Sequence, residues 1–90
     1  MKNKLKKINS SYIEGYELGD YYLIKSYDWG NKYNWILSKE CNYYGGIEAD
    51  REFNKGNIKY VGSCKNGKEL LVKLYNKEIA FNDIKALYYM

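Results

Sequence analysis

Three carboxylates at alternate positions are the side chains of this sequence that come closest to forming a reactive group. Glu48, Asp50 and Glu52 are each separated by one non-acidic residue within the segment 47–53. On a β-strand they would share one face, roughly 7 Å apart, because successive side chains point to opposite faces. Carboxylates in this arrangement could transfer protons or bind Mg²⁺ or Ca²⁺ through their oxygens. A solvent-exposed strand has the same pattern without any chemistry, and we favour that interpretation, with a helical turn as the alternative conformation.

The other side chains that catalysis commonly needs are missing. The chain has no histidine, so its five serines lack the usual partner base. Two cysteines without histidine cannot supply the four ligands of a structural zinc site. Cys41 and Cys64 are expected to remain reduced and to pack as small apolar side chains. The sequence therefore predicts a protein that is not an enzyme and that holds no metal or cofactor.

Tyrosine is the residue type that the sequence has in excess. Twelve of the 90 residues are tyrosine, whose amphipathic ring suits binding surfaces. Codon composition is the competing explanation, because Phe, Tyr, Met, Ile, Asn and Lys, which have AT-rich codons, together make up 48 of the 90 residues. That composition is typical of low-GC bacteria and their phages, so it also indicates an origin.

The net charge of +4 comes from the first ten residues. Lys2, Lys4, Lys6 and Lys7 lie there without an acidic residue, whereas residues 11–90 carry eleven basic and eleven acidic side chains. We therefore divide the chain into a basic N-terminal tail, 1–10, and a single small domain, 11–90. The four lysines are candidates for contact with phosphates or an acidic surface; a solvated terminus is the alternative. No apolar run reaches the length of a membrane span and no signal-peptide pattern opens the chain, so a cytoplasmic protein is expected.

Short β-type segments separated by turns must position these side chains. Residues 21–28 and 33–39 predict a hairpin, and Tyr43 and Tyr44 fall in a loop before two glycines. Residues 58–64 and 69–75 flank Asn66-Gly67, the preferred centre of a type I′ turn, and predict a second hairpin. Asn82 is a candidate N-cap for a short C-terminal helix that would contain Ile84, Leu87 and Tyr88.

Together these segments predict a mainly β fold, a small antiparallel meander of five or six strands closed into an SH3-like or similar barrel. Tyr16–Ile24, with Gly19-Asp20 inside it, resembles the entry into the first strand of many SH3-like barrels. Leu70–Leu87 resembles their last strands and the short helix that closes the barrel. The resemblance implies a fold and no activity, because such folds host many functions.

The leading hypothesis is a small binding protein from a phage or mobile element that occludes a host defence complex. In general character it is similar to anti-CRISPR proteins. Its candidate partner-binding residues are rings in or beside the predicted loops, namely Trp29, Tyr33, Tyr43 and Tyr44. The alternative is a module that binds single-stranded nucleic acid or a nucleotide, with tyrosines stacked on bases and the N-terminal lysines on phosphates.

Overall fold

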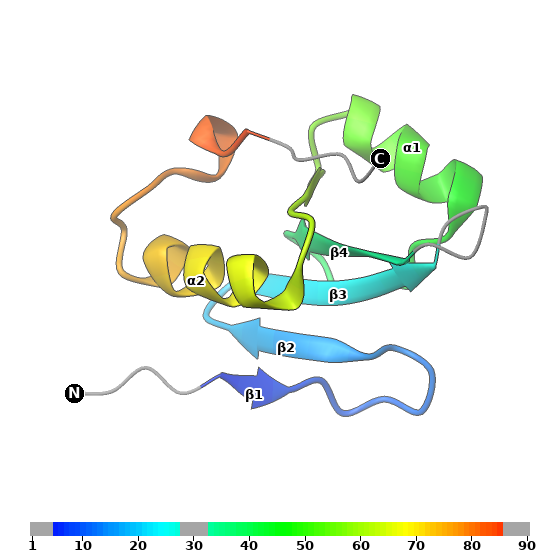
Figure 1. Cartoon of the computed structure of the whole chain (residues 1–90), viewed down its shortest axis with the longest axis horizontal. Coiled ribbons are helices and arrows are strands. Elements are labelled where there is room, and N and C mark those ends of the chain that lie inside the picture. The colour runs from blue at the N-terminus through cyan, green and yellow to red at the C-terminus, as the bar shows by residue number, and fades with distance from the viewer. Residues whose placement is uncertain (1–4, 28–32, 86–90) are drawn as a thin grey trace.

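A five-stranded antiparallel sheet with one helix on each face forms the body of the protein (Figure 1). The computed structural model describes residues 5–27 and 33–85. The strands follow one another across the sheet in chain order. The elements are β1 (Lys6–Lys7), β2 (Gly15–Leu18), β3 (Tyr21–Tyr27), β4 (Tyr33–Ser38), α1 (Gly46–Asn54), β5 (Ile58–Tyr60), α2 (Cys64–Tyr75) and the 3₁₀ turn η2 (Phe81–Asp83).

The predicted first hairpin is confirmed and forms the centre of the sheet. β3 and β4 pair with Leu23 opposite Leu37 and Ile24 opposite Ile36. All four side chains are completely buried. Because neighbouring residues of a strand point to opposite faces, the sheet must be covered on both sides.

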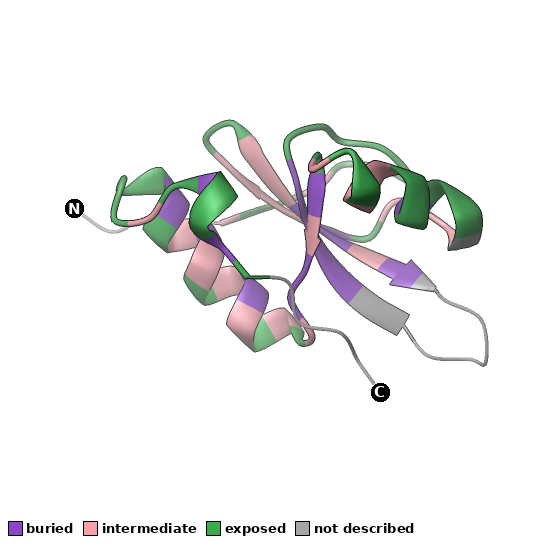
Figure 2. Ribbon diagram, turned by 90° about the horizontal axis from the view of Figure 1, so that it is seen from above, coloured by how far each residue is buried: buried purple, intermediate pink, exposed green. Residues whose placement is uncertain are grey.

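Two separate cores follow from this double burial. The first core contains Leu23 and Leu37 and is covered by α2 and η2, including Leu71 and Phe81. The second core contains Ile24 and Ile36 and is covered by α1, through Ala49. Figure 2 shows the buried strands between the two helices.

The predicted barrel is not closed. The mainly β, antiparallel prediction is confirmed with five strands, but β1 and β5 are the two ends of the strand order and do not pair within the described residues. A barrel buries its inner face by curling the sheet onto itself. Here α1 and α2 cover the two apolar faces instead, so no closure is needed.

The second hairpin prediction was wrong, because its whole second strand, 69–75, belongs to α2. Ser63 has an extended backbone and its Oγ accepts a hydrogen bond from the Asn66 amide at 3.1 Å, which caps the helix. Gly67, Leu71 and Leu74 are buried at the spacing of one helix face. The Asn-Gly pair therefore lies inside the first turns of a helix, and only Ile58–Tyr60 remains a strand.

The solvent-exposed strand favoured over 47–53 was also wrong, since this segment is α1; the helical alternative is the conformation found. Ala49 is buried and Phe53 is half-buried, four residues apart, against the second core. Residues four apart lie on the same side of a helix, so Ala49 and Phe53 both face the apolar surface formed by Ile24 and Ile36.

Within the described residues, the predicted closing helix is a 3₁₀ turn that begins before Asn82. It is the single turn η2, with Ala80 as N-cap and Asn82 inside it. Phe81 and Ile84 are buried in the first core, whereas Leu87 and Tyr88 lie outside the described residues. Over the described ranges, none of the helices has the length and apolar character needed to cross a membrane.

Candidate interaction surface

The three carboxylates of 47–53 do not form a common site. Because they lie on a helix, at about 100° per residue, Asp50 points away from the side of Glu48 and Glu52. Asp50 Oδ1 accepts a hydrogen bond from the Tyr60 hydroxyl at 3.1 Å. Glu52 accepts one from Asn57 Nδ2 at 2.8 Å, which lowers the pKa of this carboxyl, with a smaller contribution from nearby Lys55. In the part of the chain that the structure describes, no three metal-ligating side chains lie together.

The four predicted partner-binding rings are placed very differently. Trp29 lies outside the described residues. Tyr33 opens β4, where its backbone is opposite Tyr27. Tyr43 is 51% exposed, as predicted for a contact residue, but Tyr44 is 5% exposed. The structure therefore keeps Tyr43 as a candidate and contradicts the expected exposure of Tyr44.

Two buried serines explain why Tyr44 belongs to the core. Ser26 Oγ donates to the Tyr44 carbonyl oxygen at 2.5 Å, and the Tyr44 hydroxyl lies 2.8 Å from Ser38 Oγ. Both serines lie on the same face of the sheet as Ile24 and Ile36. A polar side chain at such a core position needs a hydrogen-bond partner.

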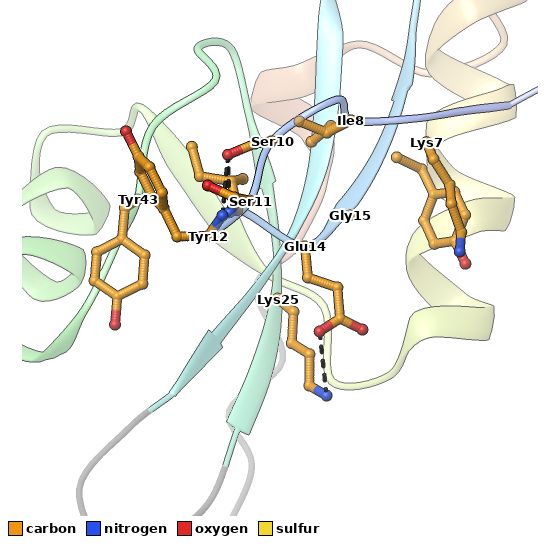
Figure 3. A pocket seen from close by; sticks show the side chains of 11 residues that line it. Lys7, Ile8, Ser10, Ser11, Tyr12, Glu14, Gly15, Lys25 and Tyr43 are labelled. Carbon is orange, nitrogen blue, oxygen red and sulfur yellow. Dashed lines mark hydrogen bonds and ion pairs between the residues drawn. The ribbon is translucent and has the colours of Figure 1, made fainter.

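Two further exposed side chains accompany Tyr43. Tyr12, in the loop between β1 and β2, is 76% exposed, and Ile47, in the first turn of α1, is 67% exposed. Tyr12 and Tyr43 line the same hollow, together with Ser10 and Ser11 (Figure 3). We refer to Tyr12 and Tyr43, which line this hollow, and to the exposed Ile47, four residues after Tyr43, as the tyrosine surface; sequence reasoning missed Tyr12 and Ile47.

The loop that carries Tyr12 is held in place from both sides. Ser10 Oγ accepts hydrogen bonds from the backbone amides of Tyr12 and Ile13, at 3.2 and 3.1 Å. Ile13 packs against the second core. Just beyond the loop, Glu14 forms an ion pair with Lys25 at 3.8 Å. A pre-ordered loop loses less conformational entropy when it binds a partner.

Tertiary structure separates the charges that balance along the sequence. α1 carries three acidic residues and one arginine, whereas α2, on the other face of the sheet, carries three lysines and one glutamate. Lys6 and Lys7 form β1 and so belong to the sheet, while Lys2 and Lys4 lie outside the described residues. On the α2 side, Lys68 Nζ lies 4.3 Å from the centroid of the Tyr16 ring.

The two cysteines are free, and only one packs as predicted. Cys64 is half-buried beside the first core, but Cys41 is exposed, which contradicts the expectation for it. Local burial raises the pKa of the Cys41 thiol, and the negative charge of Glu17 raises it further. A raised pKa disfavours the thiolate, so nothing here activates Cys41 as a nucleophile.

Comparison of the chain with protein-family models, curated proteins and solved structures gave no match.

Proposed function

We propose that this protein is a non-catalytic inhibitor that binds a host protein complex through the tyrosine surface. The observation that carries the proposal is the exposure of Tyr12, Tyr43 and Ile47. Of the described side chains, these are three of the four large hydrophobic ones that are exposed. Tyrosine rings on ordered loops are frequent hot spots because they bury a large area at a small entropic cost.

The composition supports the remaining parts of the proposal. A 90-residue chain rich in AT-coded residues fits a gene of a phage or mobile element in a low-GC host. We infer that its target is a host defence complex in the cytoplasm and that it acts by covering a surface of that complex. Occlusion requires a contact surface and no catalytic group.

Affinity capture with matched variants tests the proposal. The wild-type protein should capture a stoichiometric partner from a low-GC host lysate, and the triple variant Tyr12→Ser, Tyr43→Ser, Ile47→Ser should lose it. Tyr75→Ser is the control because Tyr75, at the end of α2, is 49% exposed outside the tyrosine surface. Equal capture by the triple variant and the wild type would refute the contact surface.

Single-stranded nucleic-acid binding is the second candidate function. It is favoured by the position of Lys68 Nζ over the Tyr16 ring and by Lys7, the cross-strand neighbour of Tyr16. Neutralising Lys7 or Lys68 should each lower the slope of log affinity against log salt by about one if both contact phosphates. Fluorescence anisotropy with a labelled thymidine oligonucleotide measures this slope, and an unchanged slope would remove the candidate.

A further inference from the structure

We propose a phosphate-binding site formed by Lys39 and Lys59 above the ring of Phe81. Lys39 Nζ lies 4.9 Å from the centroid of this ring and Lys59 Nζ lies 5.6 Å from it. The two ammonium groups therefore cannot be farther apart than the sum of these distances. The residues of this site lie in β5, in η2 and just after β4, none of which carries the tyrosine surface, so the site goes beyond the proposed function.

The sheet register brings the two lysines together. Lys59 in β5 is directly opposite Leu37 in β4, and Lys39 follows Leu37 by two residues. Since side chains alternate along a strand, Leu37 and Lys59 point to the face that α2 and η2 cover. Lys39 follows the last residue of β4, and its Nζ reaches the same Phe81 ring. Lys39 is exposed and Lys59 is half-buried, so the pair is open to solvent on one side.

The Phe81 ring contacts both lysine ammonium groups and is itself packed in the first core. Its side chain is 5% exposed and its ring stacks on Tyr21, with centroids 5.6 Å apart and planes at 8°. A cation is attracted to the face of an aromatic ring, which holds each ammonium group in place. The ring thus positions two flexible side chains that would otherwise move independently.

Among the described residues, the two cations have no carboxylate counter-ion. Asp83 of η2 and Asp20 line a hollow to which Tyr21 and Phe81 also contribute, but neither lysine lines it. Two like charges held over one ring repel each other, and an anion between them converts the repulsion into attraction.

Phosphate is the anion that suits this arrangement best. Lysine binds phosphate as a point charge with three rotatable donors. A phosphate group has three or more acceptor oxygens directed to different sides, so it can accept hydrogen bonds from ammonium groups on two strands at once. A carboxylate has only two oxygens in one plane, which suits the planar fork of arginine better than two separate lysines.

Isothermal titration of the full chain with tripolyphosphate tests the site. The wild type should bind, and Lys39→Gln and Lys59→Gln should each weaken binding about tenfold, the typical loss for one charged hydrogen bond. Lys65→Gln, an exposed lysine in the first turn of α2, is the matched control and should bind like the wild type. Should Lys59→Gln fail to fold, the exposed Lys39→Gln variant decides alone.

Further ligands distinguish the sources of the phosphate. A nucleoside triphosphate that competes with tripolyphosphate would indicate a free phosphate ligand, whereas competition by a thymidine oligonucleotide would indicate a nucleic-acid backbone. Either supports the site. The site would be overturned if tripolyphosphate did not bind, or if Lys65→Gln weakened binding as much as Lys39→Gln does. It would also be overturned if a glutamate polymer bound as tightly as tripolyphosphate.

Discussion

The hydroxyl oxygen of Tyr44 lies 2.8 Å from Oγ of Ser38, between the sheet and α1. Ser38 Oγ also lies 2.6 Å from the Glu40 carbonyl oxygen, which accepts a hydrogen bond from it, and either hydroxyl can be the donor of the hydrogen bond between Ser38 and Tyr44. This bond fixes the last residue of β4 to the loop that follows it. It also orients the chain so that the adjacent ring, that of Tyr43, faces solvent.

Replacement of Tyr44 should therefore destabilise the fold, whereas replacement of Tyr43 should not. Tyr44→Ala removes a buried ring and should cost about 3–5 kcal/mol. Tyr44→Phe removes only the hydrogen bond and should cost about 1 kcal/mol. Tyr43→Ala is the control and should change stability by less than about 0.5 kcal/mol.

Thermal unfolding separates these outcomes, because each kcal/mol moves the midpoint by roughly 4–8 °C in a domain of this size. A Tyr44→Ala variant as stable as Tyr43→Ala would show that the ring is not part of the core.

Gly67→Ala should destabilise the protein although alanine is the better helix former. A Cβ at this position would overlap Leu23 Cδ1 and lie 3.1 Å from Val61 Cγ2. Alanine gains about 1 kcal/mol of helix propensity, but overpacking a core typically costs about 1–3 kcal/mol. We expect a net loss of about 1 kcal/mol, measured by chemical denaturation.

Leu23→Ala provides the control for Gly67→Ala. In this background the overlapping methyl group is gone, so Gly67→Ala should become neutral or stabilising. The coupling in the double-mutant cycle should then exceed about 0.5 kcal/mol. Additive effects would mean that α2 does not pack on Leu23 through Gly67.

Cys41 should react more slowly with iodoacetamide than a free peptide thiol at the same pH. Burial and the charge of Glu17 raise the pKa of this thiol, and only the thiolate reacts. The pH profile of alkylation, followed by mass spectrometry in a Cys64→Ser background, should be shifted to higher pH. Glu17→Gln should shift the pH profile part of the way back to that of a peptide thiol, since burial contributes more than Glu17 to the raised pKa. A profile identical to that of a peptide thiol would contradict this environment.

The sequence by itself determined the central hairpin and the absence of histidine chemistry. The strand-forming residues of 21–28 and 33–39 are close in the chain, so β3 and β4 pair through local contacts. The predicted mainly β, antiparallel arrangement of strands depended on this local pairing, and it is the part of the fold that was confirmed.

Tertiary structure decided what the flanking segments became. Residues 47–53 fit both a strand, by alternation, and a helix, through Ala49 and Phe53; the uncovered face of the sheet selected the helix. Asn66-Gly67 fits a tight turn in isolation, but the Ser63 cap and the packing of Gly67 on Leu23 place it in α2. The Ser63 cap is local, but the contact of Gly67 with Leu23 joins residues far apart in the chain, so no local pattern reveals it.

The same reason governs the candidate sites. Tyr43 and Tyr44 are adjacent residues of one type, and only the position of the second core makes one exposed and the other buried. Lys39 and Lys59 are twenty positions apart and meet over Phe81 only because β4 pairs with β5. The sequence determined which side chains are present, whereas the pairing of strands and the covering of each sheet face determined which of them meet, because those contacts depend on distance in space and not along the chain.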